Sequence, residues 1–237
     1  MENALEILSY SPPGWGGALL RGLMSTLQIA FGAYLLGLCI GLFGAFGKIY
    51  GGPVLKWSLE IYTTLIRAVP ELVLILLLYY AGSDLLNFIL ESFGFERIDI
   101  NPLVAGIYVI GFVQGAYTTE VFRGAFHAVP TGQIEAAKAI GMSSWKRHTR
   151  VVIPAMLPFA LPGLANLWLI ATKETALLAV VGFSELALVT KQATGSTKAY
   201  LTLYLAAAAL YLSVTLVSNV IFGFIERHYR RGQPEQA

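Results

Sequence analysis

The sequence is short of charged residues, cysteine and histidine, and these shortages exclude several classes of protein. Asp, Glu, Lys and Arg make up 13% of its 237 residues, against about 25% in an ordinary soluble domain. A soluble globule of this size needs more polar surface than that. The net charge of +2 is too small for a nucleic-acid-binding surface. The single cysteine, Cys39, allows no intrachain disulfide, and we expect it to pack as a small apolar side chain.

Motifs for nucleotide, metal and catalytic sites are missing as well. The phosphate-binding pattern GxxxxGK[ST] does not occur, because residues 51–53 before Lys56 lack its spacing and its second glycine. We therefore expect no cofactor on this chain. The histidines, His127, His148 and His228, show no metal-ligand spacing, and we expect them to face solvent or anionic lipid. No His or Cys set would serve a membrane-embedded enzyme.

What the sequence does contain is long apolar runs. A helix of about 20 mostly apolar residues crosses the hydrocarbon core of a bilayer, and we find five such runs. We predict an all-α integral membrane protein with five transmembrane helices in a single domain, residues 1–237. The predicted spans are residues 18–46, 57–81, 102–122, 157–181 and 200–225.

Basic residues collect in alternate links, which predicts the orientation because basic loops stay in the cytoplasm. The basic links carry Lys48 and Lys56 after the first span, Arg123, Lys138, Lys146, Arg147 and Arg150 after the third, and Arg227, Arg230 and Arg231 in the tail. The second link is mainly acidic, with Asp84, Glu91, Glu96 and Asp99 against Arg97. Lys191 and Lys198 in the fourth link depart from the alternation. The pattern predicts an outside N-terminus and an inside C-terminus.

The first predicted span carries a glycine-rich face that includes the GxxxG pair Gly37–Gly41. Such pairs let helix backbones approach closely in lipid. We predict close helix packing at this face. The pattern leaves open whether the neighbouring helix belongs to the same chain or to a second subunit.

The longest predicted cytoplasmic segment, residues 124–156, contains the pattern of a short capped helix. Thr131 is a candidate N-cap, and Glu135 lies in the first turn, where the helix dipole favours an acidic residue. Gly141 follows at the position where a left-handed C-terminal cap is expected.

This short helix would present a small knob formed by Ala136, Ala137 and Lys138. A helix of this kind can enter a groove on another protein. A second, basic amphipathic piece, Ser144–Ile153, ends at Pro154, just before the fourth span. The segment is thus predicted to be a docking element for a partner.

The spacing in this segment resembles the EAA loop of bacterial ABC importer permeases. Glu135-Ala136-Ala137 is followed by Gly141 and then by Val151-x-Ile153-Pro154, where the family usually has Ile-x-Leu-Pro. Three further stretches resemble the polar amino acid and opine uptake branch: YTTLIRAVPEL (62–72), GAYTTEVFRGA (115–125) and KETAL (173–177). The resemblance covers about residues 16–230. It is closest to permeases for histidine, for lysine, arginine and ornithine, and for octopine and nopaline.

The resemblance implies a type I ABC importer permease fold in the bacterial cytoplasmic (inner) membrane. It also implies a second permease subunit, identical or homologous, two cytoplasmic ATPase subunits that hold ATP and Mg²⁺, and a periplasmic solute-binding protein. The substrate would be a polar, basic amino acid or an arginine-derived opine, and the chain itself would not be an enzyme. The ATPase-coupling residues implied are Glu135, Ala136, Ala137, Gly141 and Pro154. Two alternatives remain: an importer of another amino acid such as glutamine or methionine, and a stand-alone channel or carrier.

Several ionisable residues fall within the predicted spans, and these are candidates for the substrate path: Arg67, Glu71, Glu120, Lys173 and Glu174. A charge at bilayer depth costs about 2.5–3.5 kcal/mol and usually faces a cavity or a partner. Two interpretations stay open. In one, Arg67 pairs with Glu71 four residues on, and Glu120 pairs with Arg123. In the other, Glu71, Glu120 or Glu174 contacts a cationic or zwitterionic substrate.

Overall fold

The protein is all-helical over residues 4–98 and 101–229, which the computed structural model describes. Asp99, Arg230 and Arg231, which entered the predicted charge pattern, lie outside the described residues. The elements are α1 (Ala4–Ile7), α2 (Gly16–Tyr50), α3 (Pro53–Ala68), α4 (Glu71–Ser92), α5 (Pro102–His127), α6 (Thr131–Ala139), α7 (Ser144–Arg147), the π-helix η1 (His148–Val152), α8 (Ile153–Glu174), the 3₁₀-helix η2 (Thr175–Val181), α9 (Leu186–Thr197) and α10 (Tyr200–Tyr229).

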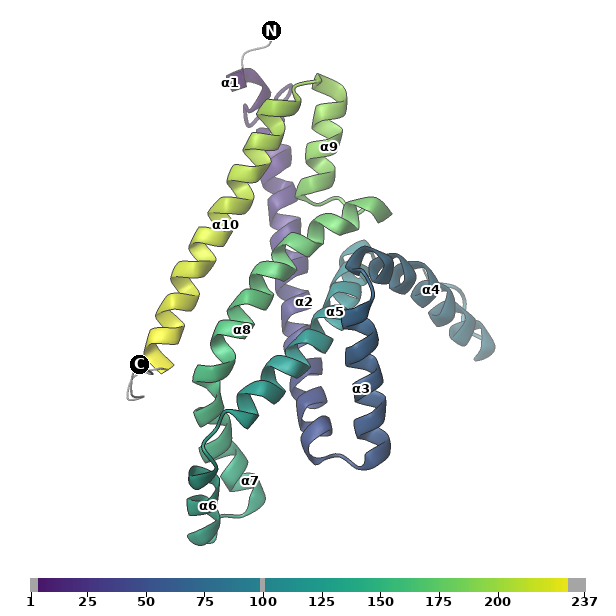
Figure 1. The fold of residues 1–237 in the computed structure, drawn as a ribbon. Helices are drawn as coiled ribbons and strands as arrows, with labels where there is room; N and C mark the ends of the chain where they lie inside the picture. Colours follow the sequence, from purple (N-terminus) through teal and green to yellow (C-terminus); the bar gives the residue numbers. More distant parts are fainter. Residues whose placement is uncertain (1–3, 99–100, 230–237) are drawn as a thin grey trace.

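Two long helices, α2 and α5, pack closely along the centre of the molecule (Figure 1). Gly37 and Gly41 of α2 face Gln114 and Thr118 of α5. A Cβ atom on Gly41 would lie 2.5 Å from Thr118 Cβ, well inside the normal contact distance of about 3.5–4.0 Å. The predicted close packing at the glycine face is confirmed, and the neighbouring helix belongs to the same chain. Cys39 of α2, however, is exposed rather than packed.

The predicted span 57–81 is divided between two helices, so the prediction of one continuous helix there is wrong. Val69 has extended backbone angles, φ −98° and ψ 139°, because a residue that precedes proline is disfavoured in the helical region. Pro70 then precedes α4, which starts at Glu71 and leaves the bundle at a steep angle (Figure 1). Because the apolar run extends across this break, its pattern predicts a single helix.

Four helical stretches in the described part of the chain are long and apolar enough to cross a membrane. They are Gly16–Tyr50, Glu71–Ser92, Ser144–Val181 and Tyr200–Tyr229. α5 is not among them, although it is 26 residues long, because its polar residues reduce its hydropathy: Gln114, Thr118, Thr119, Glu120 and Arg123. The chain is therefore a multi-pass membrane protein.

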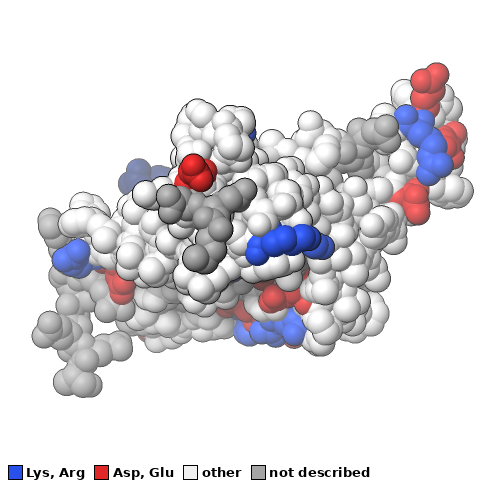
Figure 2. Space-filling model, turned by 90° about the horizontal axis from the view of Figure 1, so that it is seen from above, with Lys and Arg blue, Asp and Glu red and all other residues white. Residues whose placement is uncertain are grey.

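The two ends of the molecule contain different segments of the chain (Figure 1). One end, which we call the basic end, contains the α2–α3 turn, the segment between α5 and α8, and the last turn of α10. α1 and the corner between α9 and α10 lie at the other, the α1 end. Seen from the α1 end, charged side chains gather on the α4 side (Figure 2), where Arg97 pairs with Asp84 and Glu91. The three basic links of the sequence thus share one end.

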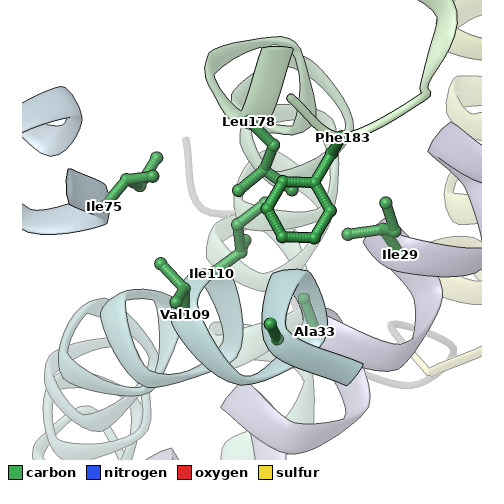
Figure 3. Close-up of a cluster of buried hydrophobic side chains, with 8 residues drawn as sticks. Ile29, Ala33, Ile75, Val109, Ile110, Leu178 and Phe183 are labelled. Atoms are coloured by element: carbon green, nitrogen blue, oxygen red, sulfur yellow. The ribbon is translucent and has the colours of Figure 1, made fainter. Parts of the chain in front are cut away.

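A buried apolar core joins four of these elements (Figure 3). It includes Ile29 and Ala33 of α2, Ile75 of α4, Val109 and Ile110 of α5, Leu178 of η2, and Phe183. Next to it, the buried Glu185 caps α9 by accepting hydrogen bonds from the amides of Ala187 (2.9 Å) and Leu188 (2.8 Å). The same carboxylate accepts from the hydroxyls of Thr26 (3.3 Å) and Tyr211 (3.2 Å). It therefore ties α9 to α2 and α10.

Candidate functional site

The α5–α8 link, residues 128–152, projects from the basic end (Figure 1). Its first helix, α6, ends in a glycine cap, because Gly141 has a φ of +75°. The Gly141 amide donates to the Lys138 carbonyl (2.9 Å), and the Met142 amide donates to the Ala137 carbonyl (3.1 Å). These two bonds are those of the Schellman motif. The left-handed cap predicted at Gly141 is confirmed.

The start and the surface of α6 differ from the prediction. Thr131 is the first helical residue rather than the N-cap, because Pro130 occupies the cap position and no side chain caps the helix. Ala137 is 3% exposed, since α6 packs on η1, so it is not part of an exposed knob. Ala136 and Lys138 are exposed, as predicted, and Glu135 is exposed beside them.

Two large apolar side chains extend the exposed surface of the link beyond the predicted knob. Ile140 is 73% exposed and Trp145 is 78% exposed. Ile140 directly precedes the glycine cap, and Trp145 lies in the short α7, which Ser143 caps through the Lys146 amide (3.5 Å). An exposed isoleucine and tryptophan among basic residues are suited to burial against a partner.

The second half of the link runs into α8 without interruption. Pro154 was predicted to end a separate amphipathic piece, but it lies in the first turn of α8. Because proline has no amide hydrogen, it cannot bond the Arg150 carbonyl. The Ile153 amide instead donates to the His148 carbonyl five residues back. The helix therefore widens locally into η1, a π-helical turn of the kind often found at functional sites.

His148 of η1 joins the link to the end of α2. Its Nε2 lies 2.6 Å from Tyr50 Oη, and its Nδ1 lies 2.7 Å from the Ser144 carbonyl oxygen. The Tyr50 ring stands edge-on to His148, with centroids 4.9 Å apart, and to Phe126 of α5, with centroids 5.7 Å apart. We expected His148 to face solvent or lipid; it is half-buried, and it also belongs to an aromatic cluster that joins three helical elements.

Glu120 belongs to an ion-pair network at the basic end. Lys48, whose side chain is 4% exposed, places its ammonium 2.6 Å from Glu120 and 2.8 Å from Glu60. It also donates to the Thr63 hydroxyl (2.7 Å). The other Glu120 oxygen accepts from Arg123 Nη2 (2.7 Å). The Glu120–Arg123 pair is thus present, and both oxygens of Glu120 are already bonded.

Arg67 and Glu71 do not form the predicted pair. The break before Pro70 places them on different helices, and Arg67 Nε donates to the Thr63 carbonyl (3.2 Å). Lys173, near the end of α8, is exposed and makes no ion pair within the described part of the chain.

Glu174, the last residue of α8, is buried beside Gln114 of α5. Gln114 Nε2 donates to Glu174 Oε2 (2.7 Å), while Gln114 Oε1 and Glu174 Oε1 are buried without a hydrogen-bond partner. The carboxyl group of Glu71, in the first turn of α4, is close enough to Glu174 for the two negative charges to repel each other. Buried acceptors without partners are unfavourable, and a cation or an N–H donor would satisfy them.

The sequence analysis missed Gln114, Tyr50 and the structural role of Lys48. A signal for Gln114 existed, because it is a lone amide in the apolar part of a predicted span. Lys48 was used only for orientation, and no spacing pattern links Tyr50 to His148.

Comparison with known proteins identifies the family. Residues 37–231 match the profile of binding-protein-dependent transport system inner membrane components. HisQ, the permease protein of the histidine/lysine/arginine/ornithine transport system of Escherichia coli (strain K12), is 42% identical over 219 residues, which cover 92% of this chain and 96% of HisQ. NocQ, the nopaline transport system permease protein of Agrobacterium fabrum, is 41% identical over 234 residues, which cover 98% of this chain and 99% of NocQ.

The fold agrees with this assignment. The crystal structure of an amino acid ABC transporter with histidines contains a chain that is 30% identical and matches with a TM-score of 0.79, over 96% of this chain and 99% of the other. The predicted resemblance to amino acid and opine permeases is therefore confirmed. The chain belongs to the binding-protein-dependent transport system inner membrane components, the permeases of ABC importers.

Proposed function

We propose that this chain is one permease subunit of an ATP-driven importer that carries a basic amino acid or an arginine-derived opine across the bacterial inner membrane. The observation that carries the proposal is the projecting α5–α8 link, with its glycine-capped α6, in a chain whose relatives HisQ and NocQ serve such transport systems. The partners are a second permease subunit, two ATPase subunits that bind ATP and Mg²⁺, and a periplasmic solute-binding protein.

The proposed topology is that of a type I importer permease, with five spans and the basic end in the cytoplasm. α5 is the fifth span, because Gln114, Thr118 and Thr119 are buried where α2 and α8 pack on it. The common end of the three basic links supports this orientation. In a Cys39→Ser background, single cysteines at Tyr10 and Ile140 would test it with a membrane-impermeant maleimide on intact spheroplasts. We expect labelling at position 10 alone. Labelling at position 140 alone would show that the chain has the opposite orientation.

The proposed ATPase contact is the exposed surface of the link, with Glu135 and Ala136 on α6. Ile140 and Trp145 add apolar contact area, and the glycine cap holds α6 in place. Of the residues assigned to coupling from the sequence, Ala137 and Pro154 would act indirectly. Ala137 packs α6 on η1, and Pro154 shapes the entry into α8.

Two substitutions test the ATPase contact. Glu135→Lys reverses a charge on the exposed face of α6. Gly141→Pro removes the φ of +75° that the cap requires. Both should abolish most co-purification of the ATPase while the permease still inserts in the membrane. Gly132→Ala, where an added Cβ meets nothing within 4 Å, is the matched control. Normal co-purification with both variants would contradict the assignment.

The proposed substrate contact is the Gln114–Glu174 pair, with Glu71 close by. The unpaired oxygens of Gln114 and Glu174 can accept hydrogen bonds from an ammonium or guanidinium group. Glu120 is less suited to this role than the sequence implied, because Lys48 and Arg123 occupy its oxygens. The proposed substrate class is therefore cationic.

Glu174→Gln tests the substrate contact because it keeps the shape of the side chain and removes its charge. Hydrogen bonds to charged groups contribute about 1.5–3 kcal/mol, so we expect uptake of radiolabelled arginine to fall at least about tenfold in proteoliposomes that contain the whole complex. Glu96→Gln, at an exposed residue, should leave uptake unchanged. Wild-type uptake by Glu174→Gln would refute the contact, and loss of complex assembly would assign Glu174 a purely structural role.

A further inference from the structure

The α5–α8 link is attached to the rest of the bundle in three places. Two attachments are covalent, because the link follows α5 directly and because α7, η1 and α8 form one continuous helical path. The third is the contact between His148 of η1 and Tyr50, the last residue of α2. A movement of the link can therefore reach α2 as well as α5 and α8.

The Tyr50–His148 contact is directional and supported on several sides. The Ser144 carbonyl can only accept, so Nδ1 of His148 carries the proton, and in the neutral ring Nε2 accepts from the Tyr50 hydroxyl. The Tyr50 ring is held by Phe126 of α5 and by Phe46, whose ring stacks on it with centroids 6.0 Å apart. Tyr50 is 52% exposed, and these two rings pack on its covered side and orient it toward His148.

The α2 helix would carry such a movement further. α2 and α5 are packed so closely at Gly41 and Thr118 that they must move together. α5 carries Gln114, and α8 carries Glu174. The covalent attachments of the link lead to the two sides of the Gln114–Glu174 hydrogen bond, and the Tyr50–His148 contact adds α2, the helix that packs along α5.

We propose that the Tyr50–His148 hydrogen bond is a positioning contact that transmits movement of the α5–α8 link to the α2–α5 pair. Movement driven by the ATPase then acts on α2, which packs along α5, in addition to α5 and α8, which are covalently joined to the link. This inference rests on the proposed function, since it requires an ATPase docked on the link.

The test compares variants of the complete complex, with both permease subunits, the ATPase and the binding protein, in proteoliposomes. Arginine uptake and ATP hydrolysis are measured in the same vesicles, and the readout is their ratio. Tyr50→Phe keeps the ring and removes only the hydroxyl, and His148→Ala removes the acceptor. Each should lower the ratio about fivefold, because the loss of one net hydrogen bond changes an equilibrium constant by about that factor.

Two further variants separate transmission from general damage. His148→Gln should restore most of the ratio, because its amide oxygen can accept from Tyr50. Tyr204→Phe, at an exposed tyrosine of α10 that makes no hydrogen bond to the described residues, should leave the ratio at the wild-type value. The double variant Tyr50→Phe/His148→Ala should be no worse than either single variant.

An unchanged ratio in both Tyr50→Phe and His148→Ala would overturn the inference. Equal loss of uptake and hydrolysis, together with loss of ATPase co-purification, would also overturn it, because the contact would then only shape the docking surface. The proposed function fails in a different way. In that case the wild-type complex would show neither uptake nor stimulation of ATP hydrolysis by the binding protein.

Discussion

Replacing Gly41 by alanine should weaken the α2–α5 pair, and the size of the effect can be worked out from the geometry. The added Cβ would lie 2.5 Å from Thr118 Cβ and 2.9 Å from the Thr118 carbonyl carbon, whereas carbon atoms pack at about 3.5–4.0 Å. The helices would have to separate by on the order of 1 Å. Overpacking of this kind costs about 1–3 kcal/mol, and the better helix propensity of alanine returns up to about 1 kcal/mol. We expect a net loss of about 1–2 kcal/mol in the free energy of unfolding.

Gly124→Ala on α5 is the matched control, because an added Cβ there meets nothing within 4 Å. Only helix propensity acts at that site, so stability should be unchanged or higher. Adding Thr118→Gly to Gly41→Ala removes the obstructing Cβ and should recover part of the loss. The assay is thermal unfolding of the purified permease in one detergent, followed by tryptophan fluorescence. Equal stability of Gly41→Ala and Gly124→Ala would refute the close approach of α2 and α5.

Three other substitutions have expected outcomes. Lys48→Met leaves Glu120 and its neighbours without their buried cation, and we expect a loss of about 3 kcal/mol in the same thermal assay; wild-type stability would show that the network contributes nothing. Glu185→Ala removes the cap of α9 and two hydroxyl contacts. Amide hydrogen exchange in α9 should therefore become at least about tenfold faster. Unchanged exchange would contradict the capping role. Gly182→Ala places a Cβ at φ +87° and should cost about 1–2 kcal/mol, whereas Gly195→Ala, with open space around it, should not lower stability; equal effects of the two would argue against a left-handed residue at position 182.

The features that the sequence predicted correctly are those encoded by local patterns. Runs of apolar residues gave the membrane character, and the Gly37–Gly41 spacing gave the packed face. The glycine at position 141 gave the end of α6, because a left-handed residue there is strongly favoured to be glycine. Each of these patterns is decided within a few turns of one helix, so no distant residue is needed to recognise it.

The features that were missed depend on residues far apart in the chain. Tyr50 meets His148, and Gln114 meets Glu174, only after the helices have packed. The proline at position 70 is a visible signal for a helix break. The apolar residues on both sides of it nevertheless match the pattern of one continuous span. The Glu120–Arg123 pair, one of the two interpretations left open by the sequence, is present, while the sequence indicated only a topological role for the second partner, Lys48. Charge counting predicts on which side of the membrane a link lies, but it cannot identify the residue that Lys48 contacts.

The central pairing of α2 with α5 also sets an order for assembly on the ribosome. Gly41 is synthesised early, but its neighbour Thr118 is synthesised only after α3 and α4 have been made. Until then the glycine face of α2 has no helix of its own chain to pack against, and it is open to insertion factors or to lipid. α8, α9 and α10 are synthesised later, and we expect them to dock on the α2–α5 pair, with which α8 and α9 are in contact. A truncated chain that ends before α5 should therefore be degraded, whereas one that ends after it should persist in the membrane.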